Sequence, residues 1–171
     1  SSRVRCLASV FSEISSEISR PLIANRPFAG LINILSRFRD ADDFDFKKAE
    51  TFVREAKSQG NKVIFIGNGG SAAIASHMAA DYQKSGRVPA MCLTEASAIT
   101  SLSNDLSYEK VFTEQIHFHG KPGDILFAIS SSGQSQNIVH AAILAAAKHM
   151  TVITLSGFKE QNPLRAIGEV N

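Results

Sequence analysis

The chain has few of the residues that mark specialised classes of protein. Its 171 residues include two cysteines, Cys6 and Cys92, which are too few and too far apart to indicate a disulfide scaffold. It has no apolar run of the roughly 18 residues that a membrane span needs. Its formal net charge of +2 lacks the excess of Lys and Arg that is typical of nucleic-acid-binding proteins. We therefore expect a cytoplasmic protein with no membrane segment and no direct contact with nucleic acid.

The pattern of the chain changes near residue 61. Residues 1–60 show apolar side chains at helical spacing, such as Phe11, Ile14 and Ile18, and we expect a helical arm there. Its apolar load is more than a short arm can bury on its own domain, so it also predicts a homo-oligomer. Residues 61–171 alternate short apolar runs with helical patterns, which predicts an α/β domain with a mostly parallel sheet covered on both faces. The expected strands are 63–67, 89–93, 124–129 and 151–155, and the expected helices are 46–58, 71–85, 94–102, 108–118 and 135–150, the last of them buried almost all round.

The first candidate site is the turn Asn68-Gly69-Gly70-Ser71, between the strand 63–67 and the helix that follows. Two glycines allow the backbone to take a positive φ and to approach a ligand closely. Ser71 is expected to cap the helix, whose free N–H groups and positive dipole end favour an anion, most often a phosphate. On these residues alone, a tight turn without a ligand is an equally good interpretation.

The second candidate site repeats this arrangement after the strand 124–129. Four serines, Ser130, Ser131, Ser132 and Ser135, stand between that strand and the next helix. Hydroxyls and backbone N–H groups at a helix start suit the acceptor oxygens of a phosphate. Because ligands of open parallel sheets bind beyond the carboxyl ends of the strands, both loops are expected at the same edge. The second loop therefore favours a phosphate site over a mere connection.

Several motifs together resemble one family. The segments GNGGSAA, SHMAAD, LSND, GDILFAISSSGQSQNIV and TVITLSG occur in the order found in the SIS (sugar isomerase) family, and within it they are most similar to bacterial phosphoheptose isomerases. The resemblance implies a flavodoxin-like three-layer sandwich with strand order 2-1-3-4-5, a homotetramer, and active sites at subunit interfaces. It implies no nucleotide cofactor. Residues 169–171 are expected to begin one more strand, so that the last strand and helix of the domain would lie beyond residue 171.

The resemblance also implies roles for individual residues. It places Ser130, Ser131, Ser132 and Ser135 at the phosphate, Asn68, Gly69, Gly70 and Ser71 at the sugar, and Asn104 and Asp105 at the substrate as well. His77 and Asp81 fall at two of the positions that bind zinc in some members, and Asp81 stands where the family usually has a catalytic Glu. From spacing alone, His77 and Asp81 lie one helical turn apart on the same face, where a solvated charge and a structural histidine remain the alternative. The family's catalytic histidine lies on a helix beyond residue 171.

Two functions follow from this reading. The first is a phosphosugar isomerase that converts sedoheptulose 7-phosphate to D-glycero-D-manno-heptose 7-phosphate through an enediolate, for the synthesis of a cell-surface polysaccharide such as lipopolysaccharide. Asp81 would be its base, since moving a proton between adjacent carbons needs one. The second is a non-catalytic SIS protein that binds a sugar phosphate or acts as a scaffold, as tetrameric relatives do with the replication initiator. The sequence leaves open which sugar phosphate is bound.

Overall fold

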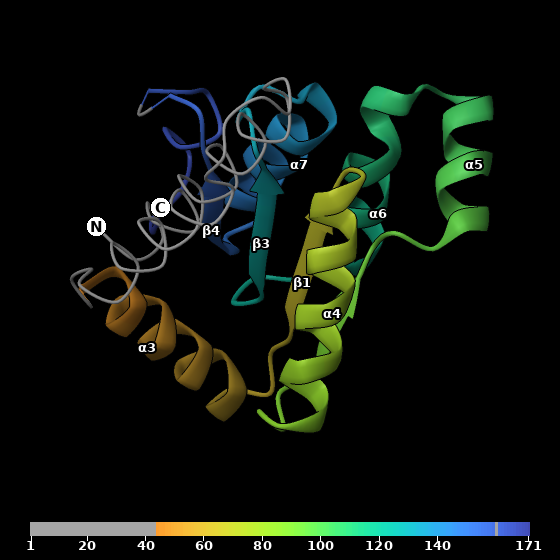
Figure 1. Ribbon diagram of the computed structural model, residues 1–171. Coiled ribbons are helices and arrows are strands. Elements are labelled where there is room, and N and C mark those ends of the chain that lie inside the picture. The colour runs from red at the N-terminus through yellow and green to blue at the C-terminus, as the bar shows by residue number, and fades with distance from the viewer. Residues whose placement is uncertain (1–43, 160) are drawn as a thin grey trace, which may run out of the picture.

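A four-stranded sheet forms the centre of the computed structural model, which describes residues 44–159 and 161–171 (Figure 1). Its strands are β1 (Val63–Gly67), β2 (Ala90–Cys92), β3 (Ile125–Ser130) and β4 (Thr151–Ser156). All three pairings are parallel, and the order is β2-β1-β3-β4. This confirms the predicted α/β class and the first four positions of the predicted order.

The predicted fifth strand is not among the strands of the described residues. One isolated parallel bridge joins Ile153 of β4 to Val170. Two backbone hydrogen bonds accompany it, from Thr154 N to Val170 O at 2.9 Å and from Glu169 N to Val152 O at 2.8 Å. Residues 169–171 therefore run alongside β4, in the place where a fifth strand was expected.

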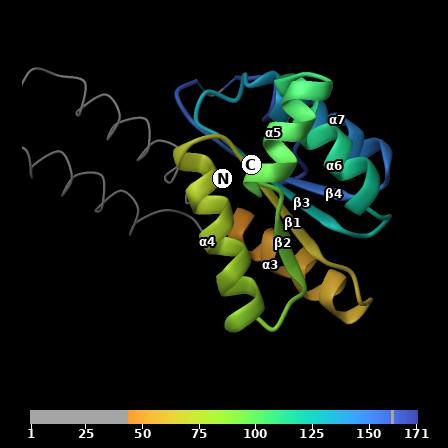
Figure 2. The same ribbon diagram turned by 90° about the vertical axis from the view of Figure 1, so that its right-hand side faces the viewer.

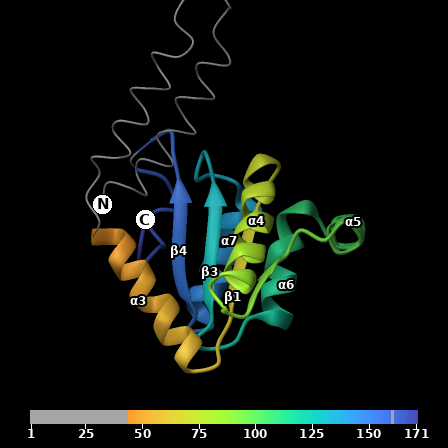
Figure 3. The same cartoon turned by 60° about the horizontal axis from the view of Figure 1, so that its bottom comes forward.

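Helices cover both faces of the sheet (Figures 2 and 3). Helices α3 (Phe44–Ser58) and α4 (Gly70–Lys84) lie on one face, and α6 (Val111–His119) and α7 (Gln136–Ala147) lie on the other. Helix α5 (Ala96–Asp105) and the short 3-10 helix η1 (Tyr108–Lys110) precede α6. This arrangement confirms the predicted three layers. The predicted arm falls on residues 1–43, outside the described residues, except for its last helix, which is α3.

Alternation along the strands divides the core between the two faces. Ile64, Ile66 and Leu126 pack against α6 and α7, whereas Val63, Phe65 and Phe127 pack against α3 and α4. The rings of Phe65 and Phe127 stack with their centroids 4.9 Å apart. Because both faces of β1 and β3 are buried, these strands are continuous apolar runs in the sequence rather than alternating ones.

Two predictions about the helices were wrong. The helix 135–150 was expected to be buried almost all round, but Ile143 of α7 is 52% exposed, because α7 is an outer layer that packs on one side only. The helix 94–102 begins later and ends later, as α5, because the Glu95 side chain accepts a hydrogen bond from Ala98 N at 2.9 Å and caps it. No helix in the described part of the chain is both long and apolar enough to span a membrane.

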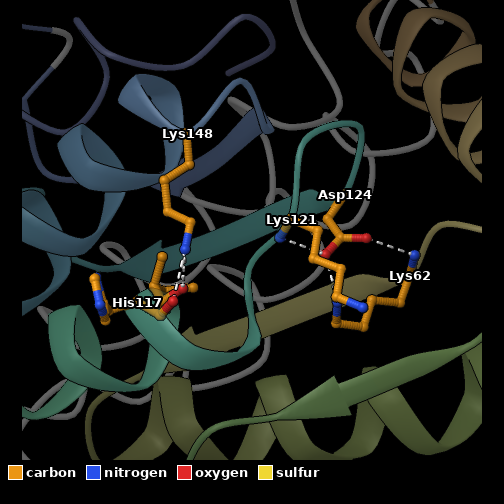
Figure 4. Close-up of polar contacts among 6 residues, drawn as sticks. Lys62, His117, Lys121, Asp124 and Lys148 are labelled. Atoms are coloured by element: carbon orange, nitrogen blue, oxygen red, sulfur yellow. Dashed lines mark hydrogen bonds and ion pairs between the residues drawn. The ribbon is translucent and has the colours of Figure 1, made fainter.

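The amino ends of the central strands are held by a buried carboxylate (Figure 4). Asp124, which is 1% exposed, pairs with the Lys62 ammonium group and also accepts hydrogen bonds from Lys62 N at 3.0 Å and Lys121 N at 2.9 Å. Nearby, Lys148 Nζ donates to His117 O at 2.6 Å at the end of α6, where a cation suits both the free carbonyl groups and the helix dipole. These groups satisfy one another and fasten the amino end of the sheet.

Candidate functional site

The β1–α4 loop turns earlier than the sequence predicted. Helix α4 begins at Gly70 with Gly69 as its N-cap, so the predicted cap Ser71 lies inside the first turn. The backbone of Gly69 has φ +53°, a conformation that a side chain would disfavour, and this allows the N-cap to lie two residues sooner than Ser71. Ser71 N and Ala72 N donate instead to the backbone oxygen of Asn68.

The β3–α7 loop is a compact turn held from behind. Ser135 is the N-cap residue of α7, and its backbone oxygen accepts from Ile138 N and Val139 N, each at 3.0 Å. A Cβ on Gly133 would come within 2.0 Å of Asn162 Oδ1, so only glycine fits between the loop and the segment that follows β4. The four serines are thereby fixed relative to the start of α7.

The serines differ in their surroundings. Ser130 is 5% exposed, and its hydroxyl accepts a hydrogen bond from Gly133 N at 3.2 Å and contacts Ser135 Oγ at 3.3 Å. Its side chain therefore supports the loop from inside. Ser131 is exposed, whereas Ser132 and Ser135 are half-buried. A ligand can therefore reach Ser131, Ser132 and Ser135 more readily than Ser130.

Both loops present backbone donors to open space. No backbone hydrogen bond between described residues uses the N–H of Gly69 or Gly70, and a Cβ on either glycine would meet nothing within 4 Å. At the other loop, Gln134 N donates to Ser132 Oγ at 3.2 Å, whereas the N–H groups of Ser135, Gln136 and Asn137 have no partner among the described residues. Free N–H groups at two adjacent helix starts are suited to an anion.

Hydrogen bonds between side chains join the two loops. Asn68 Nδ2 donates to Asn137 Oδ1 at 2.9 Å, and Asn137 Nδ2 donates back to Asn68 Oδ1 at 3.0 Å. The hydroxyl of Tyr108, in η1, also donates to Asn68 Oδ1 at 2.9 Å. Sequence reasoning named Asn68 but missed Asn137 and Tyr108. The only signal in the sequence was a polar Asn in the first turn of an otherwise apolar helix.

An apolar groove of about 570 Å³ opens beside the loops, between α3 and α4. Figure 3 shows these helices on the same side of the sheet, with β3 and β4 between them. Ser71, Asp81 and Ser131 line the groove together with apolar side chains such as Ile74 and Phe127. The groove thus brings the predicted base and one residue of each predicted loop to a single cavity.

His77 and Asp81 contact each other on α4, as their spacing predicted. His77 Nε2 lies 3.3 Å from Asp81 Oδ2, and the two side chains are 80% and 58% exposed. Tyr82, the next residue, also lines the groove, and burial raises the pKa of its hydroxyl, so that it stays neutral. Asp81 therefore contacts His77 and lines the groove, and its role as a base stays a prediction.

Asn104 and Asp105 are the last two residues of α5 rather than the polar turn that the sequence suggested. Asn104 Nδ2 donates to Asp105 Oδ1 at 2.8 Å, and both residues are exposed. Across residues 44–159 and 161–171, no hydrogen bond joins either of them to the two loops. Their predicted contact with the substrate stays a prediction.

The residues present do not make up a zinc site. Among residues 44–159 and 161–171, no three His, Cys, Asp or Glu side chains gather where they could hold a metal ion. His77 and Asp81 supply two donors, whereas zinc takes four ligands, at least three of them usually from the protein.

The arrangement defines an α/β protein with a glycine-rich turn and a serine-rich turn at the carboxyl edge of a parallel sheet. A family model described as "SIS domain" matches residues 28–157, and the chain belongs to that family. The match covers both loops, α4 and all four strands.

Within this family, the chain is similar to several phosphoheptose isomerases. The chain is 44% identical over 117 residues to a phosphoheptose isomerase of Alteromonas mediterranea, which covers 65% of this chain and 59% of that protein. Solved phosphoheptose isomerases from Neisseria gonorrhoeae and Francisella tularensis superpose with TM-scores of 0.67 and 0.77 at 33% and 28% identity. The match to the Neisseria structure covers 73% of this chain and 67% of that structure's chain. The match to the Francisella structure covers 85% of this chain and 78% of that structure's chain. The chain thus spans about three fifths of the length of the curated relatives it matches.

Proposed function

We propose that this protein is a phosphosugar isomerase that converts sedoheptulose 7-phosphate to D-glycero-D-manno-heptose 7-phosphate. The observation that carries the proposal is the groove that Asp81 shares with one residue of each loop: Ser71 and Ser131 line it at the carboxyl edge of the sheet, and Asp81 lines it about three turns further along α4. The names of the similar proteins supply the reaction and the substrate. A step in the synthesis of a cell-surface polysaccharide such as lipopolysaccharide would use this product.

The reaction moves two protons and needs no oxidant. The base takes a proton from C1 of the ketose, which gives an enediolate, and the proton is then delivered to C2. The hydroxyl proton on O1 leaves while O2 gains one, which yields the aldose. In our proposal Asp81 removes the C1 proton and returns it to C2, Ser131, Ser132 and Ser135 hold the phosphate, and Asn68 with Gly69 and Gly70 contacts the sugar.

A substitution at Asp81 tests the role of the carboxylate. Asp81→Asn keeps the size of the side chain but removes the base, and kcat should fall at least about 100-fold, within the range for general base catalysis. The measurement is turnover of sedoheptulose 7-phosphate by purified protein, together with binding of the substrate by calorimetry. Glu55→Gln, which removes an exposed carboxylate on α3 away from the groove, is the matched control and should leave kcat unchanged.

Three results would redirect the proposal. An Asp81→Asn variant as fast as wild type would mean that another group is the base. Wild-type protein that binds the sugar phosphate without turning it over would favour the non-catalytic binding or scaffold protein. Turnover of a hexose or pentose phosphate in preference to the heptose would keep the reaction and change the substrate.

We also propose that the protein assembles as a homo-oligomer, with a tetramer as the expected state. The apolar spacing of residues 1–43 supports the proposal, since such a segment needs a partner surface. Light scattering on the purified protein should give about four times the mass of one chain. A stable monomer at micromolar concentration would contradict it.

A further inference from the structure

The amide pair between the loops has a defined orientation. Ile138 N, a backbone donor that cannot accept, lies 3.0 Å from Asn137 Oδ1 and so identifies that atom as the oxygen. The other terminal atom of Asn137 is then the NH2 group, which faces Asn68 Oδ1. Because Asn137 is only 3% exposed, its amide has little freedom to turn over. The orientation of Asn68 follows from that of Asn137.

This orientation leaves Asn68 with a donor to offer and no free acceptor. Its Oδ1 accepts from both Asn137 Nδ2 and the Tyr108 hydroxyl, which fills the two lone pairs of a carbonyl oxygen. Its Nδ2 donates one of two N–H groups to Asn137. The second N–H is engaged by no other residue in the described part of the chain. Asn68 is only half-buried, so a ligand can reach that group.

We propose that Asn137 and Tyr108 are positioning residues that hold the Asn68 amide with its free N–H toward the sugar. Through Asn137 they also couple the β1–α4 loop, which contacts the sugar, to the β3–α7 loop, which holds the phosphate. The inference rests on the proposed function for the identity of the ligand. An amide held in this way donates to an oxygen, such as the carbonyl at C2 of the ketose or the enediolate oxygen that forms from it. It does not accept a hydrogen bond from a sugar hydroxyl.

The position of Asn137 fixes where the Asn68 donor lies relative to the phosphate. Asn137 lies in the first turn of α7, directly after the serines that bind the phosphate in our proposal, so the donor on Asn68 has a fixed place relative to the phosphate. Fixed donors that face developing negative charge stabilise the transition state more than the ground state. Loss of the hydrogen bonds that hold the Asn68 amide should therefore lower kcat more than it raises KM.

The test compares five variants in turnover of sedoheptulose 7-phosphate. Asn137→Asp places an oxygen against Asn68 Oδ1, and kcat should fall about tenfold or more, while the added negative charge near the phosphate also raises KM. Tyr108→Phe, at a side chain that is 51% exposed, keeps the fold and should lower kcat a few-fold. Asn68→Asp removes the donor itself, and the double variant Asn68→Asp/Tyr108→Phe should lose no more than Asn68→Asp alone, because Tyr108 then has no donor left to orient.

Gln115→Glu is the control for lost stability. Gln115 is also a buried amide, whose Nε2 donates to Leu93 O and Val111 O, but no hydrogen bond joins it to either loop among the described residues. Its variant should lower the melting temperature and leave kcat unchanged. A Gln115→Glu variant that lowers kcat as much as Asn137→Asp would overturn the proposal, as would losses that add in full in the double variant.

An NMR measurement separates this inference from the proposed function. The side-chain NH2 signals of Asn68, identified by their loss in Asn68→Asp, should shift in both Asn137→Asp and Tyr108→Phe. If those signals do not shift, Asn137 and Tyr108 do not hold the Asn68 amide, even in an active enzyme. If wild-type protein has no turnover, the proposed function fails while the signals still decide whether the two residues orient Asn68.

Discussion

The two ends of the sheet use polar residues in opposite ways. At the amino end, Asp124 is buried and has a partner for each of its oxygens, while Lys148 covers the end of α6 (Figure 4). At the carboxyl end, the N–H groups of Gly69 and Gly70 have no backbone partner among the described residues, and Ser131 is exposed at the edge of a groove. Polar groups that satisfy one another stabilise the fold, whereas preorganised groups without partners are available to a ligand.

Removing the buried carboxylate at the amino end of the sheet should give the largest change in the free energy of unfolding and no change in ligand affinity. Asp124→Ala leaves the Lys62 ammonium group and two backbone N–H groups without their partner, and removal of one member of a buried pair costs about 3–5 kcal/mol. The free energy of unfolding, measured in urea, should fall by that amount. The affinity of the protein that remains folded for sugar phosphate should be unchanged.

The control for this change is an ion pair at the surface. Glu50→Ala removes the exposed pair with Arg54 on α3, which should cost no more than about 0.5 kcal/mol. If Asp124→Ala is no more harmful than Glu50→Ala, the amino end is not the structural clamp that we describe.

Breaking the carboxyl end should change affinity and leave stability nearly unchanged. Ser132→Ala and Ser135→Ala should each weaken binding of sugar phosphate by about 1.5–3 kcal/mol, the usual loss for a hydrogen bond to a charged group. Helix α7 should be unaffected by Ser135→Ala, because the Ser135 hydroxyl makes no capping hydrogen bond. Calorimetric titration measures the loss, with Ser58→Ala at the end of α3 as the control. Unchanged affinity in both variants would remove the serine loop from the site.

The sequence predicted well those features that depend on neighbouring residues. The apolar runs of β1 and β3 gave the buried strands, and the glycines and serines after them gave the two turns. It placed the helix cap at Ser71, because serine is the better cap by its side chain, but the backbone freedom of Gly69 decided the start of α4. Helix α3 alone tests the predicted arm.

Contacts between distant residues were beyond such reasoning. The bonds of Asn68 to Asn137 and Tyr108 span 69 and 40 residues, so no local pattern announces them. The two partners of Asn68 lie in segments whose sequence indicates only packing: Asn137 in a mostly apolar helix, and Tyr108 in the short 3-10 helix before α6. Only the folded sheet, which brings the ends of β1 and β3 side by side, shows that these residues belong to the site.

The smallest expected effect has the opposite sign and lies again at the amino end. His149 follows α7 with φ +59°, and Met150 N donates to Ala145 O while His149 N donates to Ala146 O, the bonding of a helix that ends in a left-handed residue. A non-glycine residue there carries about 1–2 kcal/mol of strain, whereas glycine loses about 0.4–1 kcal/mol through the freedom of the unfolded chain. His149→Gly should therefore stabilise the protein by about 0.8 kcal/mol in urea unfolding, the difference between the midpoints of those two ranges. The His149 carbonyl, which accepts from Gly123 N at 3.0 Å, is kept, so turnover and substrate affinity should stay the same. A stabilised variant with altered substrate affinity would show that the two ends of the sheet are coupled, and a destabilised one would show that the His149 side chain has a structural role of its own.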